Sequence, residues 1–174
     1  MEILKRINII SKLTLICAII MFFFGILARI IPIYIFWESL YLSGIVFLIG
    51  VYLILHFEIR KRKSESKPSS VLIIGKVFII LSICMFTLIN LIFNNSDALT
   101  IIEDHIKKNV ELVDEIGEIE SVIALPMGAI NSKTDKRGTS GNATLTLLIK
   151  GSEKYEEMSF SAQKKIGDDW RVIE

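Results

Sequence analysis

Three long apolar runs occupy the first half of this chain and restrict what it can fold into. They cover roughly residues 13–31, 40–57 and 71–93. Each is close to the ~20 residues that a helix needs to cross the ~30 Å hydrocarbon core of a bilayer. We therefore expect a three-helix transmembrane region in residues 1–93 and a separate polar domain in residues 94–174. No small-x-small cleavage pattern follows the first run, so we expect it to stay attached as an anchor.

The two halves differ in charge, and this predicts their orientation. Residues 1–93 contain ten Lys and Arg against four Glu, whereas residues 94–174 contain ten against fifteen Asp and Glu. The loop after the second run is basic and contains Arg60, Lys61, Arg62, Lys63 and Lys67. Because short basic loops stay in the cytoplasm, we expect a cytoplasmic N-terminus and an acidic tail on the outer face of a bacterial inner membrane. Acidity also argues against nucleic acid as the partner of the tail.

The first two runs carry residues suited to an interfacial turn and to close helix packing. The turn between them is rich in aromatic residues, Tyr34, Phe36, Trp37 and Tyr41. Such side chains favour the membrane–water interface. Three glycines, Gly25, Gly44 and Gly50, are expected to let the helices approach each other closely.

Two kinds of chemistry are conceivable within the apolar runs. Lys76 sits early in the third run, where its stem can reach the cytoplasmic interface; the alternative is an intramembrane ion or proton site. Cys17 and Met21 share a helix face, and Cys84 lies on the third run. Soft sulfur ligands suit copper(I), but Cys and Met are also ordinary apolar packing residues. We expect no metal or cofactor here.

The tail begins with a helix and continues with strands. Polar residues 94–96 end the last apolar run and supply capping side chains. A helix is predicted over residues 97–113, breaking near Asn109, with a buried stripe spaced three or four residues apart. The stripe consists of Leu99, Ile102, Ile106, Val110 and Val113. Gly117 is a natural stop.

Alternating patterns then predict an antiparallel meander, so the tail is a small α+β domain with its helix packed on the sheet. Strands are expected over residues 118–125, 142–150, 156–164 and 170–174, with a polar loop over residues 131–141. Pro126 and Gly128 mark a strand end, a bulge or an edge. The inward residues are expected to be Ala143, Leu145, Leu147, Ile149, Met158, Phe160, Ala162, Trp170 and Val172.

No catalytic constellation is visible in the tail. It has no Cys, its single histidine is His105, and no Gly-rich phosphate loop opens a helix. Weak alternatives are a cation site formed by Glu115, Glu118 and Glu120, and a basic contact for anionic lipid or an acidic partner formed by Lys133, Lys136 and Arg137. Solvated side chains explain both groups. The sequence therefore predicts a non-enzymatic domain with no catalytic, cofactor-binding or metal-binding residues.

Several short motifs follow one another in the tail in a distinctive order. They are Ile106-Lys107-Lys108-Asn109, Glu115-Ile116-Gly117-Glu118-Ile119-Glu120, Gly141-Asn142-Ala143-Thr144-Leu145, Ile149-Lys150-Gly151 and Ala162-Gln163-Lys164-Lys165-Ile166-Gly167-Asp168-Asp169-Trp170-Arg171-Val172. This order is similar to that of the soluble domain of the cytochrome c oxidase assembly factor one family, over residues 97–174. That family shares its fold with an intermembrane-space subunit of the mitochondrial presequence translocase.

The resemblance implies a membrane-tethered, non-enzymatic domain that faces away from the cytoplasm and assists respiratory-complex assembly by binding other membrane proteins. It transfers no catalytic residues. The chain differs from the family in having three expected membrane helices instead of one. Two other functions stay open: a small transporter or copper-handling protein that uses Cys17, Met21, Cys84 and Lys76, and a sensor whose outer domain binds a small ligand.

Overall fold

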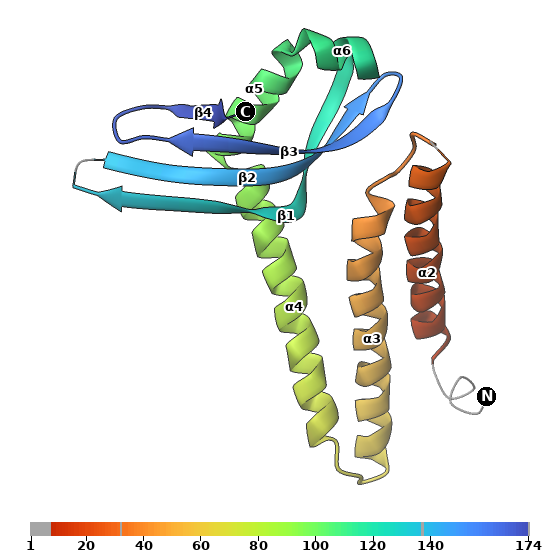
Figure 1. Cartoon of the computed structure of the whole chain (residues 1–174). Coiled ribbons are helices and arrows are strands. Elements are labelled where there is room, and N and C mark those ends of the chain that lie inside the picture. The colour runs from red at the N-terminus through yellow and green to blue at the C-terminus, as the bar shows by residue number, and fades with distance from the viewer. Residues whose placement is uncertain (1–7, 32, 137, 174) are drawn as a thin grey trace. The chain divides into compact units, whose positions relative to one another are not determined.

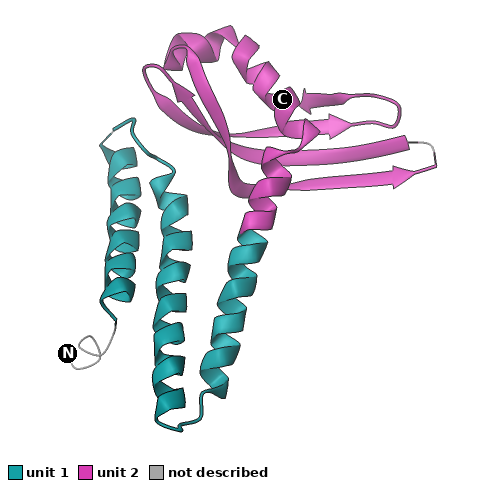
Figure 2. Cartoon of the chain, turned by 180° about the vertical axis from the view of Figure 1, so that it is seen from behind, with its two compact units in different colours: residues 1–86 teal, residues 87–174 magenta. Residues whose placement is uncertain are grey.

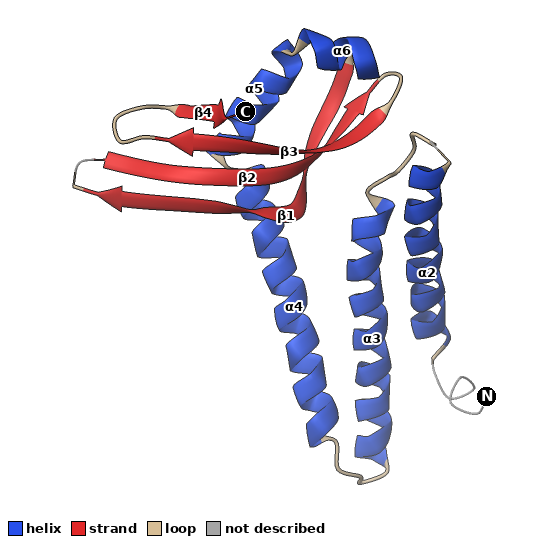
Figure 3. Cartoon of the chain, in the orientation of Figure 1, coloured by secondary structure: helices blue, strands red, loops and turns tan. Residues whose placement is uncertain are grey.

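The structure is a computed structural model that describes residues 8–31, 33–136 and 138–173. The chain divides into two compact units, residues 1–86 and residues 87–174 (Figure 2). The described elements run from three long helices to two short helices and a four-stranded antiparallel sheet (Figures 1 and 3). The predicted fold class, an α-helical membrane region followed by a small α+β domain, is confirmed.

The three apolar runs form long helices. They are α2 (Ile9–Ile30), α3 (Ser39–Ser64) and α4 (Ser70–Asn94). With 22, 26 and 25 residues, all three are long and apolar enough to cross a membrane. Many large apolar side chains on them are exposed, such as Phe23 at 58% and Phe78 at 71%. Outward apolar side chains suit lipid rather than water, so the chain is a multi-pass membrane protein.

Helices α2 and α3 pack closely against each other through two of the three predicted glycines. A Cβ atom added to Gly25 would lie 2.7 Å from the backbone nitrogen of Leu40, and one added to Gly50 would lie 2.7 Å from Cδ2 of Leu15. Gly44 is different, because a Cβ atom there would meet nothing within 4 Å. The expectation that Gly44 permits a close helix approach is therefore wrong: it lines an apolar hollow of about 310 Å³ instead.

The predicted tail helix is two helices, α5 (Asp97–Lys108) and α6 (Val110–Ile116). Asn109 ends the first and caps the second, since its Oδ1 accepts a hydrogen bond from the backbone N–H of Leu112 at 3.2 Å. This break changes which residues face inward. Val110 was expected in the buried stripe but is 70% exposed, and Leu112 is buried in its place. The extended backbone at position 109 interrupts the helical period, so residues after it face directions that a continuous helix would not give them.

The sheet is a meander with the strand order β1-β2-β3-β4. Its strands are β1 (Ile119–Asp135), β2 (Gly138–Gly151), β3 (Tyr155–Lys164) and β4 (Trp170–Ile173). The expected polar loop over residues 131–141 is wrong, because Gly128–Asp135 pairs in continuous register with Gly138–Leu145. Polar residues suit this strand pair because most of them are exposed. The irregularity expected around Pro126 is a register shift between Ala124 and Gly128.

The core of the second unit lies between the helices and one face of the sheet. Its fully buried members include Ile102, Ile106, Leu145, Leu147 and Ile149. Trp170 and Val172 pack against this core as predicted. Met158 lies on the predicted face, opposite Leu147, but is 37% exposed. Among the described residues, β4 pairs with residues 161–164 of β3, and no strand pairs with the outer side of β3 at Met158.

The last turns of α4 belong to the second unit. Phe93 is 8% exposed and is part of the core, and Ile89 packs against it. The compact unit therefore starts at residue 87 and not at residue 94, the expected domain boundary. A helix end that supplies core residues cannot be read from composition, because an apolar residue facing a core and one facing lipid look alike in sequence.

Candidate partner-binding surface

The two faces of the sheet differ in chemistry. Side chains along β2 alternate: Ala143, Leu145 and Leu147 are at most 2% exposed, whereas Asn142 and Thr144 between them are exposed. Successive side chains of a strand point to opposite faces. Because α5 and α6 contact the sheet through its apolar face, Asn142 and Thr144 lie on the opposite face. Leu148, further along the same face, is fully buried, so we call only the exposed end of this face, around Asn142 and Thr144, the uncovered face.

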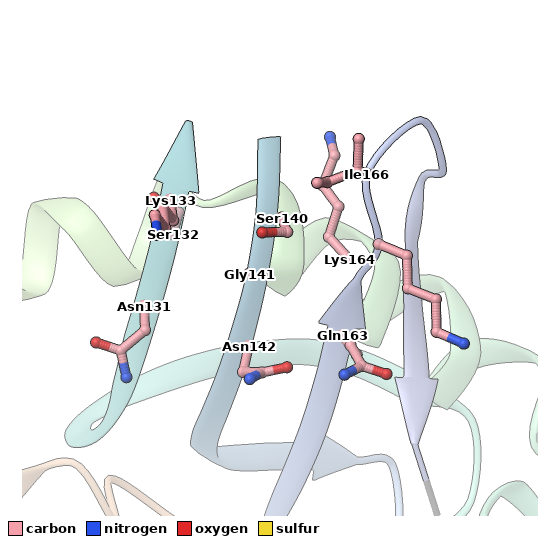
Figure 4. A pocket seen from close by; sticks show the side chains of 10 residues that line it. Asn131, Ser132, Lys133, Ser140, Gly141, Asn142, Gln163, Lys164 and Ile166 are labelled. Atoms are coloured by element: carbon pink, nitrogen blue, oxygen red, sulfur yellow. The ribbon is translucent and has the colours of Figure 1, made fainter. Parts of the chain in front are cut away.

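A line of amide side chains crosses the uncovered face. Asn131 pairs with Asn142 across β1 and β2, and Asn142 pairs with Gln163 across β2 and β3. We call Asn131, Asn142 and Gln163 the amide row (Figure 4). All three are exposed. None forms a side-chain hydrogen bond within the described residues, so each keeps two N–H donors and one carbonyl acceptor for another molecule.

The neighbouring hydroxyl groups, in contrast, are paired within the sheet. Thr144 and Ser161 lie 3.2 Å apart between their hydroxyl oxygens, and Thr146 and Ser159 lie 3.0 Å apart. Such cross-strand pairs contribute to sheet stability. These four hydroxyl groups therefore have partners within the sheet, whereas the amide side chains have none among the described residues.

The amide row borders an open hollow of about 500 Å³ that carries positive charge. Besides the amide row, it is lined by Ser132, Lys133, Ser140, Gly141, Lys164, Lys165 and Ile166. Its three lysines form no ion pair with any described residue, and the lining includes no carboxylate. Ammonium and amide N–H groups both donate to carboxylate and carbonyl oxygens. The hollow therefore suits a polar, acidic segment of a partner.

β1 adds a free edge beside this surface. Within the described residues, this 17-residue strand pairs with β2 alone. An edge strand presents unpaired backbone N–H and C=O groups on which an extended segment can add as a further strand. The stretch after the Ala124–Gly128 irregularity is exposed at all positions from Asn131 to Asp135. A bound segment could thus use the edge and the amide row together.

Gly141 fixes the position of this surface relative to the core. A Cβ atom there would lie 2.7 Å from the carbonyl oxygen of Asn131 and 2.9 Å from Cη2 of Trp170. Any side chain at position 141 would therefore collide with the β1 backbone and with the indole ring. Trp170 therefore supports from behind the strands that carry the amide row.

Arg29 in the membrane unit has a structural explanation. Its guanidinium donates to the carbonyl oxygens of Gly25 at 2.7 Å and Trp37 at 3.1 Å. Its Cζ also lies 5.1 Å from the centroid of the Trp37 ring and 5.6 Å from that of Tyr41, within cation–π range. The interfacial aromatic turn is thus organised around one arginine.

The structure gives no support to the predicted alternatives for metal chemistry. Cys17 and Cys84 are both free and exposed. Among the described residues, no group of three or more His, Cys, Asp and Glu side chains could hold a metal ion. Glu115, considered for a cation site, instead accepts a hydrogen bond from Lys154 at 2.7 Å.

His105 and Lys76, the two remaining candidates, lie in different surroundings. His105 borders a hollow of about 350 Å³ next to Trp170. Lys76 lies beside His56 and Tyr52. Arg137, considered with Lys133 and Lys136 as a basic contact, lies outside the described residues.

Sequence reasoning missed the amide row because residues 131–141 read as a loop. One signal was present: Asn131 and Asn142 are placed symmetrically about Lys136-Arg137. This spacing fits a hairpin, although Lys-Arg is not one of the dipeptides that favour a two-residue hairpin turn. The pairing of Asp135 with Gly138 continues in register and places the two asparagines opposite each other.

Comparison of the chain with protein-family models, with curated proteins and with solved structures returns no match. The resemblance of residues 97–174 to the cytochrome c oxidase assembly factor one family therefore remains a prediction that rests on the order and spacing of short motifs.

Proposed function

We propose that this chain is a non-enzymatic, membrane-anchored binding protein whose α+β domain lies outside the cytoplasm and holds another membrane protein. The observation that carries the proposal is the uncovered face of the sheet. There, the three unpartnered amides of the amide row border a lysine-lined hollow next to a free strand edge. The partner presents an acidic, extended segment to this face.

The class of partner comes from the family resemblance. Soluble domains of that family assist respiratory-complex assembly, so the proposed partner is an assembly intermediate of such a complex, with cytochrome c oxidase as the first candidate. Membranes from cells with and without this protein should then differ in their content of assembled oxidase. Equal oxidase content would exclude an oxidase assembly intermediate as the partner. The binding surface would then need a partner of another class.

The proposed orientation follows from the basic loop between α3 and α4. With Arg60–Lys63 in the cytoplasm, three crossings place the domain on the far side of the membrane. Topology reporters inserted at residue 63 and fused after residue 174 should report opposite compartments. Reports from the same compartment would contradict the proposal.

Photo-crosslinking in intact membranes tests the surface itself. A photoreactive residue at Asn142 or Gln163 should capture one membrane protein in a specific adduct. The matched control is the same residue at Glu111, which is exposed on α6 and away from the sheet face. An adduct that forms equally well from Glu111, or no adduct from the amide row, would count against the proposal.

A further inference from the structure

Lys76, in the membrane unit, is partly buried and has no carboxylate partner among the described residues. Its Nζ lies 3.1 Å from Nδ1 of His56 and 4.8 Å above the centroid of the Tyr52 ring. No ion pair joins Lys76 to a described residue. A charge removed from bulk water is costly unless it is paired, and a histidine nitrogen and an aromatic face do not neutralise it.

The hydrogen bond to His56 leaves a second donor at the same place. A lysine ammonium has no acceptor capacity, so it donates to Nδ1 of His56. The single proton of the neutral imidazole is then on Nε2. The His56 ring is also held by Tyr52, whose ring stacks on it with centroids 6.1 Å apart. The cluster thus offers an ammonium group and an imidazole N–H.

Positive charge continues from this cluster toward the end of α3. Tyr52, His56, Arg60 and Lys63 are spaced four, four and three residues apart, so they share one face of the helix. Arg60 and Lys63 form no ion pair with any described residue. The nearby carboxylate of Glu58 is occupied by Arg62, with 3.1 Å between Nε and Oε1.

The depth of Lys76 fits the headgroup boundary of the bilayer. It lies six residues after Ser70, the first residue of α4, which corresponds to about 9 Å along the helix axis. A lysine stem at this depth can carry its ammonium group to the interface. The groups of a bilayer that bring negative charge to this level are lipid phosphates, and basic pockets between membrane helices recognise anionic headgroups.

We propose that Lys76 and His56 form a binding site for the phosphodiester of an anionic phospholipid, such as phosphatidylglycerol, with Arg60 and Lys63 at its outer rim. The phosphate supplies the negative charge that the protein does not place beside Lys76. The nonbridging phosphate oxygens accept from the ammonium group of Lys76 and from Nε2–H of His56. This site is independent of the partner-binding surface of the second unit.

Native mass spectrometry of the full chain tests the site. The chain is purified in a mild detergent and titrated with phosphatidylglycerol or with phosphatidylcholine that has the same acyl chains. We expect phosphatidylglycerol to be retained in preference, and Lys76→Gln to weaken this retention about ten-fold, as for one lost charged hydrogen bond. Lys76→Arg, which keeps the charge and the donors, should retain the preference and shows that the position tolerates substitution.

The matched control is Lys67→Gln. Lys67 lies in the same basic segment but is exposed and paired with Glu65 at 2.6 Å, so its loss should leave lipid retention unchanged. Equal losses from Lys67→Gln and Lys76→Gln would show a general charge effect and overturn the site. Retention that Lys76→Gln does not change would overturn it as well. Displacement of phosphatidylglycerol by an equal concentration of inorganic phosphate would overturn a lipid as the occupant.

Discussion

The break at Asn109 makes a sharp prediction about two apolar residues four positions apart. Ile106 and Val110 fall on one stripe of a continuous helix, but in the structure Ile106 is fully buried and Val110 is 70% exposed. Ile106→Ala removes three carbon atoms from the core, worth about 2.4 kcal/mol at ~0.8 kcal/mol each. The cavity left behind raises the expected loss in the free energy of unfolding to about 3 kcal/mol.

Val110→Ala should change stability by less than about 0.5 kcal/mol, because substitutions on an exposed surface rarely do more. Alanine is also the better helix former, which offsets part of any loss. The two variants therefore differ in expected effect by at least a factor of five, although both shorten an apolar residue of the same predicted stripe.

Brief proteolysis of the full chain in detergent across a urea gradient measures both effects. With a slope of ~1–3 kcal/mol per M urea for a small domain, Ile106→Ala should lower the midpoint of cleavage in the tail by about 1–3 M, and Val110→Ala should leave it in place. Equal shifts would refute the reasoning, since they would mean that residues 97–113 form one continuous helix with both side chains buried.

Three other predictions use the same cleavage assay or a thermal melt. Asn109→Ala removes the cap of α6 and should cost about 1 kcal/mol, and Asn109→Asp should recover most of it; no loss would contradict the capping role. Gly151→Ala should leave little folded domain, because a Cβ atom there would lie 2.1 Å from the carbonyl oxygen of Ile116; a normal midpoint would show that the strand end can shift. A soluble fragment of residues 87–174 should melt well above one of residues 94–174, which lacks the last turns of α4, and equal melting would contradict their place in the core.

Sequence patterns predict the helices and the inward face of β2 because these depend on local chemistry. Apolar length defines α2, α3 and α4, and strict alternation places Leu145 and Leu147 inward. The β1–β2 hairpin is not predicted because its pairing depends on contacts between residues up to 32 positions apart, from Gly128 with Leu145 to Ile119 with Gly151. Its polar residues carry no apolar alternation that would reveal a strand.

The candidate surface is harder to predict than the fold for a related reason. The amide row exists only when three strands are in register, and no single motif contains its members. Lys76 and His56 are twenty residues apart and meet only because the chain turns back between α3 and α4. Each residue taken alone has an ordinary explanation, as an interfacial lysine or a surface histidine.

The residues that carry the family resemblance separate into two groups once the structure is considered. Gly117, Gly141, Gly151 and Trp170 serve the fold: the first has a φ of 82°, the next two sit where a Cβ atom would collide with backbone, and the indole packs behind the sheet. Any chain with this architecture needs residues of these kinds, so they support a shared fold but give no information about function.

Asn142 and Gln163 lie within the same motifs but have no such role. Their side chains point away from the core and form no hydrogen bond with the described residues, so the sheet does not depend on these side chains. Replacing both with serine should therefore leave the stability of the domain within about 0.5 kcal/mol of its original value while abolishing capture of the partner. If the function of this domain lies on its sheet, these outward positions, and not the glycines and the tryptophan, are where it must be found.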